Sequence, residues 1–291
     1  MTVLDLDTQR VPCALCGGGE SAPVCVNDAL EVARCAVCGL VFVNPQPTEA
    51  ALRKYHAAQS LLQQDGWSSY FQHTPAQIRE LWEERFGDLR RWINGGVPRL
   101  LDVGCGYGDF LHVARESGWR VEGFEFSPAA AEVCRSRYGL RVAVGDLLEL
   151  EFAEGSFELI TMWHVLEHLR HPLAVLRRCR ALLEPGGVLA LEVPNLNFLV
   201  RKSYRYPLSR TLHLYHFTPT TLAALVRAAG FEVLECRPGN TGFQYPRRWK
   251  VYAKKCLYAV SRAVEKLSRG NVSDSIRLYA RRREISIGAR P

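Results

Sequence analysis

The chain has 291 residues, a formal net charge of +7 and 47% hydrophobic residues. These values are typical of a globular protein and exclude a disordered chain, a collagen-like repeat and a small scaffold stapled by disulfides. No segment approaches the run of about 18 apolar residues that crosses a membrane. The first ten residues carry acids where an export signal carries basic residues. We therefore expect a cytoplasmic protein whose cysteines are reduced.

Two Cys-x-x-Cys pairs stand near the N-terminus. Cys13 and Cys16 form the first pair, Cys35 and Cys38 form the second, and a glycine follows each pair directly. Four thiolates at this spacing can bind one Zn²⁺ tetrahedrally, and the glycines allow the tight turns that aim the sulfur atoms at the metal. The sequence predicts a zinc-ribbon-like module over residues 1–47, which zinc would largely fold. The alternative is two coincidental pairs of buried cysteines.

Residues 48–97 follow a proline-rich connector and are predicted to form a helical linker or cap. Large apolar side chains recur there at three- and four-residue spacing, as in Trp82, Phe86 and Leu89. From residue 98 onward the pattern alternates between short apolar strands and amphipathic helices, which is typical of a parallel sheet with helices on both faces. Strands are expected over 99–103, 120–124, 141–144, 157–162, 188–193 and 231–236, and helices over 110–117, 129–138, 173–183 and 220–229.

The segment 247–283 is strongly basic, with twelve Lys or Arg residues but two acids. Its apolar residues recur at helical spacing, so a basic helical stretch is expected. The final run, residues 284–289 with the sequence EISIGA, has the pattern of a last strand.

A glycine-rich motif joins the first strand to the helix that follows it. Asp102 is followed by Gly104, Gly106 and Gly108, and glycines at the carboxyl end of a strand let the backbone approach a ligand closely. Glu125 ends the second strand, where a carboxylate can accept two hydrogen bonds from a ribose. Asp146 ends the third strand, where it can receive the amino group of an adenine. An NAD dehydrogenase would instead require G-x-G-x-x-G.

With these motifs the sequence resembles the class I S-adenosylmethionine-dependent methyltransferases. The resemblance implies a Rossmann-like sheet of seven strands over residues 98–291, whose last strand is antiparallel, with residues 240–283 as a basic helical insertion before that strand. It implies S-adenosylmethionine as the cofactor, with the acid of the first motif near the methionine amino end. The implied cofactor-binding residues are Asp102, Gly104, Cys105, Gly106, Glu125, Phe126, Asp146 and Leu147.

The fourth strand leads into His164-Val-Leu-Glu167-His168, and a helical turn there would place His164, Glu167 and His168 on one face. We predict a catalytic role for these three, with His164 or His168 as general base and Glu167 orienting the imidazole. The competing interpretation is that Glu167 and His168 organise the loop. The inverted zinc-protease signature H-x-x-E-H is disfavoured by its position after a cofactor-binding strand.

This stretch resembles the branch of ubiquinone-biosynthesis O-methyltransferases and of natural-product and sugar methyltransferases. Some quinone enzymes carry an acidic triplet with histidine that can hold a divalent metal. His164 stands here in place of an acid, which disfavours a metal. His213, Tyr215 and His216 precede a later helix and are predicted to bind the substrate.

The expected reaction is methyl transfer to a small-molecule acceptor, with O-methylation of a sugar, glycan or natural-product hydroxyl as the leading case. The sequence lacks the [DN]PPY motif of nucleobase amino methylation. Three alternatives stay open: C-methylation of a nucleotide-linked sugar, methylation of ribosomal RNA, and a non-catalytic S-adenosylmethionine-binding regulator. Trp249 and Tyr252 in the basic segment favour a peripheral contact with an anionic inner membrane face, or a lipid-linked acceptor, over nucleic acid. The sequence does not predict an oligomeric state.

Overall fold

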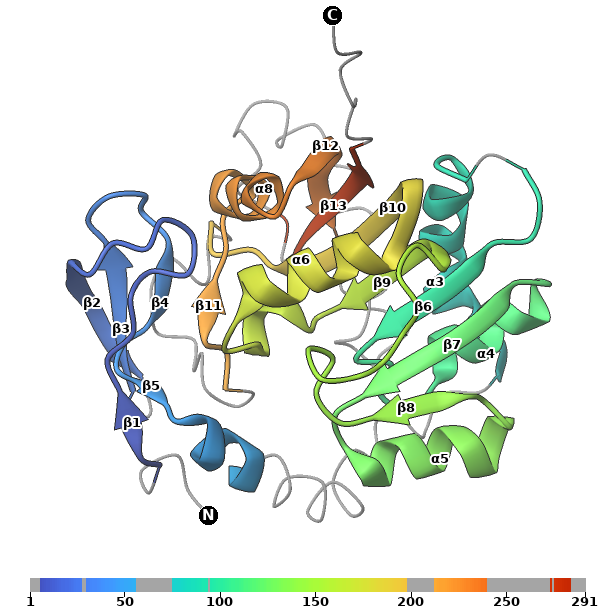
Figure 1. Ribbon diagram of the computed structural model, residues 1–291, viewed down its shortest axis with the longest axis horizontal. Coiled ribbons are helices and arrows are strands. Elements are labelled where there is room, and N and C mark those ends of the chain that lie inside the picture. The colour runs from blue at the N-terminus through green and yellow to red at the C-terminus, as the bar shows by residue number, and fades with distance from the viewer. Residues whose placement is uncertain are drawn as a thin grey trace, which may run out of the picture.

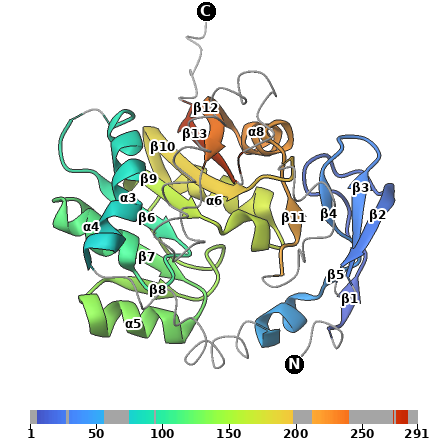
Figure 2. The ribbon, with the colours of Figure 1, turned by 180° about the vertical axis from the view of Figure 1, so that it is seen from behind.

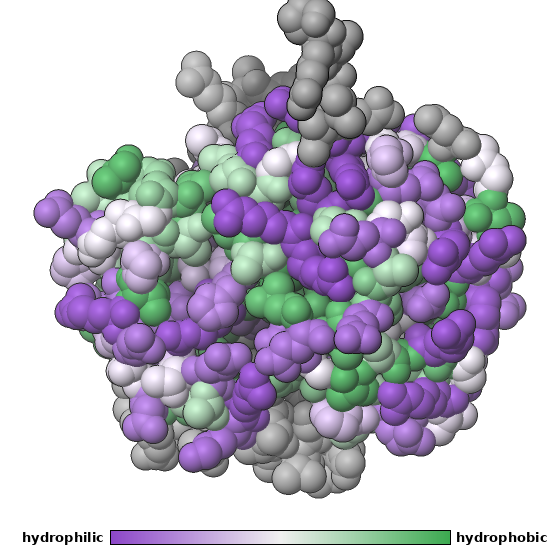
Figure 3. Space-filling view, viewed as in Figure 1, coloured by the Kyte–Doolittle hydropathy of each residue, from purple (hydrophilic) through white to green (hydrophobic). Residues whose placement is uncertain are grey.

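The computed structural model describes residues 6–27, 30–55, 75–93, 95–197, 212–239, 273 and 275–283. Within these residues an N-terminal module lies beside a larger α/β part (Figure 1). Hydrophilic side chains cover most of the face seen in Figure 3, with smaller hydrophobic areas between them. None of the described helices combines the length and the apolar character needed to cross a membrane.

The α/β part is built on a sheet of seven strands in the order β12-β13-β10-β9-β6-β7-β8. The strands are β6 (Arg99–Val103), β7 (Arg120–Glu125), β8 (Val142–Val144), β9 (Phe157–Trp163), β10 (Leu183–Pro194), β12 (Phe231–Gly239) and β13 (Ser275–Arg282). Strands β8, β7, β6, β9 and β10 pair in parallel, whereas β13 is antiparallel to both of its neighbours. The predicted seven-stranded fold class, with an antiparallel last strand, is confirmed.

Helices cover both faces of this sheet, as Figures 1 and 2 show from opposite sides. They are α3 (Pro75–Arg90), α4 (Asp109–Glu116), α5 (Pro128–Tyr138), α6 (Pro172–Leu182) and α8 (Pro219–Ala228). Buried residues of α3, α4 and α5 form one hydrophobic cluster, and those of α6 and α8 belong to a second. In the predicted cap, residues 49–55 and α3 are helical, and Trp82 and Phe86 of α3 pack on Phe110 of α4.

The seventh strand is not the predicted one. Strand β13 takes residues 275–282 out of the segment that was expected to be a basic helical insertion, and it lies between β10 and β12. The prediction failed because Arg277, whose charge suggested a solvated helix, is fully buried and pairs in register with Glu192 of β10. The run 284–289 and the rest of the insertion, 240–272, lie outside the described residues.

The N-terminal module contains two small sheets. Strands β1 (Thr8–Gln9) and β5 (Gln46–Pro47) form one pair. The other sheet has the order β11-β4-β3-β2, with β2 (Ser21–Asn27), β3 (Leu30–Cys35), β4 (Val41–Val43) and β11 (Tyr215–His216). Strand β11 comes from the α/β part, so the module and the larger sheet share a chain segment and one hydrophobic cluster. The predicted division at residues 47 and 97 stays a prediction.

Candidate functional site

The glycine motif forms a loop at the carboxyl end of β6. Gly104 has a φ of 74°, and a Cβ built there would lie 2.5 Å from Cγ2 of Val165. A side chain at position 104 would therefore push the loop away from the segment that follows β9. A Cβ built on Gly106 meets nothing within 4 Å, so the space beside this glycine is open to a ligand.

Glu125 ends β7 directly beside this loop. Its two carboxylate oxygens accept backbone hydrogen bonds from Gly106 at 2.8 Å and from Ser127 at 2.9 Å. Burial raises the pKa of Glu125, and these backbone donors oppose the rise. Each carboxylate oxygen has a second lone pair. Glu125 therefore orders the loop and still has lone pairs free for ribose hydroxyls; its predicted role in binding ribose stays a prediction.

Asp102 lies within β6 and is 2% exposed. Its Oδ1 accepts a 2.6 Å hydrogen bond from Oγ1 of Thr161 on the neighbouring strand β9. Burial raises the pKa of Asp102 to about 8 against the opposing effect of Thr161. A nearby positive charge, such as the amino end of the expected cofactor, would stabilise the ionised form of this carboxyl group and lower its pKa again.

The remaining predicted cofactor residues are divided between surface and core. Asp146 follows β8, is half-buried, and accepts the backbone N–H of Leu148 at 2.9 Å through Oδ1. Phe126 is 40% exposed beside Glu125, whereas Leu147 is buried. Cys105 is also buried, and its Sγ faces Gly123 beneath the loop. Cys105 therefore supports the loop from the core side.

The three residues predicted to be catalytic lie together after β9. His164 has a φ of 58°, in the left-handed region that non-glycine residues rarely adopt, and its N–H donates to the Glu192 carbonyl at 2.8 Å. Its Nδ1 lies 3.4 Å from Oε1 of Glu167, a carboxylate that is 1% exposed. Burial lowers the pKa of His164, but Glu167 and Glu192 raise it further, so the net shift is upward.

His168 lies on the other side of Glu167, in the single helical turn η2 (Leu166–His168). Its Nε2 is 4.0 Å from Oε1 of Glu167, and its Nδ1 is 3.3 Å from the carbonyl oxygen of Leu212. The ring of His213 packs edge-on against it, with centroids 4.7 Å apart. One side-chain donor atom from each of Glu167, His168 and His213 lies within 4.8 Å of the other two.

The other two predicted substrate residues, Tyr215 and His216, belong to β11 and are buried. The hydroxyl of Tyr215 donates to the carbonyl oxygen of Arg170 at 3.1 Å. Their backbone pairs with Val41 and Phe42 of β4. They therefore attach this segment of the chain to the N-terminal module. His213 contacts His168, one of the predicted catalytic residues.

The four predicted zinc ligands converge at one point of the module. Sγ of Cys13 lies 3.4 Å from Sγ of Cys38, and Sγ of Cys16 lies 3.5 Å from Sγ of Cys35. A tetrahedron with Zn–S bonds of about 2.3 Å has sulfur atoms roughly 3.8 Å apart, so the donor set fits zinc closely. Backbone donors, acting against burial, lower the pKa of Cys35 to about 7, which favours the thiolate that a metal needs.

Glu192 is a residue near this site that our sequence reasoning missed. It is fully buried on β10 and bonds to Arg85 of α3 and to Arg277 of β13. The sequence did contain a signal, because Glu192 lies within an apolar strand sequence. A buried acid requires a hydrogen-bonding or cationic partner. The sequence could not identify that partner, because the two arginines lie 107 and 85 residues away along the chain.

The strand order, with the glycine loop and the acids at the strand ends, is that of the class I methyltransferase fold. Residues 70–236, more than half of the chain, match the family model for a methyltransferase domain. The chain therefore belongs to the methyltransferase family. It is an S-adenosylmethionine-dependent methyltransferase, as the resemblance predicted.

Comparisons with individual proteins agree with this assignment. A ubiquinone biosynthesis O-methyltransferase of Histophilus somni is 33% identical over 133 residues, which are 42% of this chain and 56% of that protein. The match thus spans little more than half of that relative. The protein of the same name from Thiobacillus denitrificans is 32% identical over 184 residues, covering 56% of this chain and 76% of that one.

Among solved structures, an S-adenosylmethionine-dependent methyltransferase from Mesorhizobium loti shares the fold. Its TM-score is 0.51 at 23% identity, and the match covers 68% of this chain and 97% of that one.

Proposed function

We propose that the enzyme transfers a methyl group to a hydroxyl oxygen of a small-molecule acceptor, with His168 as the general base. The observation that carries the proposal is the meeting of Glu167, His168 and His213 at the end of β9. Val165, in the same segment, packs on Gly104 of the cofactor loop. The reacting hydroxyl would therefore lie between the base and the cofactor.

Bound S-adenosylmethionine supplies a methyl group on a sulfonium, which is already a good leaving group. The main task of the protein is therefore alignment, and positioning of two reactants can contribute about 7 to 11 kcal/mol. Glu125 would hold the ribose, Asp102 would lie near the amino end, and Asp146 would border the adenine. Asp102 accepts a hydrogen bond from the protein at one carboxylate oxygen, and Glu125 accepts one at each of its two oxygens. These bonds fix the orientation of both side chains before the cofactor binds.

The contacts of His168 suit proton transfer. Because Nδ1 faces the carbonyl oxygen of Leu212, the neutral ring donates from Nδ1 and keeps its lone pair on Nε2. Nε2 can then accept the hydroxyl proton as the acceptor oxygen attacks. Glu167, buried 4.0 Å from this nitrogen, would stabilise the imidazolium that forms. A general base of this kind contributes about 100- to 10,000-fold to a rate.

We propose that Glu167, His168 and His213 serve in proton transfer and do not bind a divalent cation. His164 places a ring nitrogen 3.4 Å from Glu167, at the position where the metal-holding quinone enzymes carry an acid. The neighbouring imidazole can therefore supply the positive charge that balances the buried carboxylate. The zinc that we propose for the four cysteines belongs to the N-terminal module and takes no part in the methyl transfer.

We infer a hydroxyl on a sugar, glycan or natural-product intermediate as the acceptor. The half-buried rings of His168 and His213 support a polar acceptor, because they offer hydrogen-bonding groups on one side of the site. The names of the relatives, which refer to O-methylation in ubiquinone biosynthesis, support oxygen as the atom that is methylated.

The test incubates the protein with methyl-labelled S-adenosylmethionine and a set of nucleotide sugars, glycans, phenols and protein-free ribosomal RNA. Mass spectrometry of the product then locates the label. A methyl group on a hydroxyl oxygen supports the proposal. A new carbon–carbon bond on a nucleotide sugar, or methylated RNA, would replace it with the corresponding alternative. Binding of S-adenosylhomocysteine without any labelled product would favour a regulator.

A second experiment addresses the base. We expect His168→Gln to lower kcat about 100-fold or more while leaving the affinity for S-adenosylhomocysteine unchanged. His171→Gln is the matched control, because His171 lies three residues away and is exposed. Equal kcat values for the two variants would remove His168 from the mechanism.

A further inference from the structure

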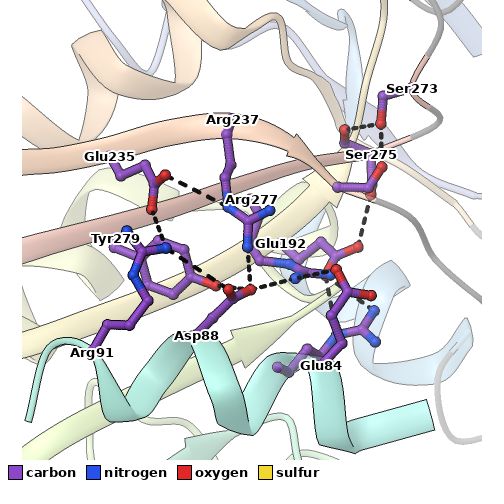
Figure 4. Close-up of polar contacts among 12 residues, drawn as sticks. Glu84, Asp88, Arg91, Glu192, Glu235, Arg237, Ser273, Ser275, Arg277 and Tyr279 are labelled. Atoms are coloured by element: carbon purple, nitrogen blue, oxygen red, sulfur yellow. Dashed lines mark hydrogen bonds and ion pairs between the residues drawn. The ribbon is translucent and has the colours of Figure 1, made fainter. Parts of the chain in front are cut away.

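Glu192 links the site to two distant parts of the chain. Its Oε2 accepts from Nε of Arg85 at 3.1 Å and lies 3.0 Å from Nη2 of the same guanidinium; it also accepts from Nε of Arg277 at 3.0 Å. Its Oε1 accepts from the hydroxyl of Ser275 at 2.7 Å. Figure 4 shows this carboxylate within a larger polar cluster that joins α3, β12 and β13 to β10.

The two oxygens of Glu192 differ in their surroundings. Oε2 is occupied by two guanidinium groups, whereas Oε1 has a single hydroxyl donor and lies 3.9 Å from Nε2 of His164. No described residue satisfies Nε2 of His164 with a hydrogen bond. Oε1 of Glu192 therefore has a lone pair left that faces this buried nitrogen.

His164 consequently lies between two buried carboxylates, with Nδ1 toward Glu167 and Nε2 toward Glu192. The backbone reinforces this arrangement, because the N–H of His164 donates to the carbonyl oxygen of Glu192. A left-handed φ at a non-glycine residue persists where surrounding contacts hold it. The charged groups that face His164 are Glu167 from η2, Glu192 from β10 and Arg85 from α3.

We propose that Glu192 is a positioning residue, which holds the His164 ring through Nε2 so that Nδ1 keeps the Glu167 carboxylate directed toward His168. This inference rests on the proposed function, because it concerns the surroundings of the proposed base. Arg85 and Arg277 fix Glu192 in turn. The orientation of the catalytic group therefore depends on the cap helix α3 and on the last strand β13.

Charge supports the same arrangement. Burial raises the pKa of Glu192, but the nearby Arg85 and Arg277 lower it further, so the net shift is downward and the group is a carboxylate at neutral pH. A carboxylate accepts hydrogen bonds only, and it therefore favours a proton on a nitrogen that faces it. Glu167 and Glu192 both favour the protonated ring of His164, whereas a general base must be unprotonated, so His168 is the better candidate for the base.

The test compares Glu192→Gln with Glu84→Gln. Both substitutions remove a carboxylate that contacts Arg277, but the side chain of Glu84 is 56% exposed and its partner in the cluster is Nη1 of Arg277. We expect Glu192→Gln to lower kcat at least 10-fold, to shift the ring ¹⁵N resonances of His164, and to leave the affinity for S-adenosylhomocysteine within about 2-fold. Glu84→Gln should leave all three quantities unchanged.

Ring resonances of His164 that are the same in Glu192→Gln as in the wild type would overturn the proposal. Should Glu192→Gln fail to fold, the wild-type spectrum decides, with the signals assigned by their loss in His164→Asn. Protons on both ring nitrogens at pH 7 support the proposal, and an unprotonated Nε2 rejects it. Because these spectra need no acceptor, absence of methyl transfer would count against the proposed function alone.

Discussion

Oγ1 of Thr161 donates a 2.6 Å hydrogen bond to Oδ1 of Asp102, and both residues are buried in adjacent parallel strands. The bond ties the acid at the end of β6 to the strand that leads to the proposed catalytic residues. It also leaves a carboxyl group in the core without a cationic partner among the bonds of the described residues. Its protonation therefore affects the stability of the whole sheet.

The first prediction concerns pH and stability. Because burial raises the pKa of Asp102 to about 8, and an unfolded Asp has a pKa of about 4, the folded chain binds the additional proton between these values. The stabilisation that the folded state gains from protonated Asp102 is fully present below about pH 4 and is lost as the pH rises through about 8. The slope is at most about 1.4 kcal/mol per pH unit. Thermal unfolding should therefore show Tm falling with pH over this window, less steeply in Asp102→Asn.

The control for this measurement is Asp7→Asn, in which the same exchange is made at an exposed position. It should keep the wild-type dependence of Tm on pH. If Asp102→Asn follows the same curve as the control, the buried carboxyl does not carry the effect.

The second prediction concerns the ribose contact. Glu125→Gln keeps the size of the side chain but removes the charge that strengthens hydrogen bonds from a ribose. Such bonds contribute roughly 1.5 to 3 kcal/mol, so calorimetry should give about 10- to 100-fold weaker binding of S-adenosylhomocysteine. Glu132→Gln on α5, whose side chain is 70% exposed, is the matched control and should bind as the wild type does. Equal affinities would place the cofactor elsewhere.

The third prediction concerns the metal. Elemental analysis of the purified protein should find about one zinc per chain, because the four thiols fit a single tetrahedral site. Cys38→Ser should lower this content substantially. Cys25→Ser should not change it, since Cys25 lies outside the group of four. Equal zinc content in all three proteins would argue against the assigned ligands.

Zinc removal should also increase hydrogen exchange outside the N-terminal module. Strand β11 pairs with β4, and the N–H of Val43 donates to the carbonyl oxygen of Leu214. A chelator strong enough to extract the metal should therefore speed hydrogen exchange at residues 214–216 as well as in β3 and β4. Unchanged exchange at 214–216 would show that β11 is held without the module.

The fourth prediction concerns the reassigned last strand. Leu278 is fully buried on β13, between β10 and β12, so Leu278→Ala should lower the free energy of unfolding by about 2 to 5 kcal/mol. Val97→Ala also removes aliphatic carbons, but Val97 is 52% exposed and the substitution should cost much less. Urea unfolding measures both. A similar small loss in the two variants would contradict the position of β13.

The sequence alone determined the features that depend on local spacing. A strand that runs into glycines and then a helix forms the glycine loop from adjacent residues, as the positive φ angles of Gly104 and Gly106 show. The acids at positions 125 and 146 could be placed beside it because parallel strands end at the same edge of a sheet. The four cysteines were equally predictable, since each pair is set by a short turn.

Only the tertiary structure decided which distant residues meet. Arg277 has the same charge as the half-buried Arg281 and Arg282, and its burial depends on Glu192, which lies 85 residues away. The sequence gives no local signal for such a pairing, so the last strand was predicted several residues too late. Likewise backbone pairing of Tyr215 and His216 with β4, more than 170 residues earlier in the chain, makes them part of the N-terminal sheet. Their predicted contact with substrate stays a prediction.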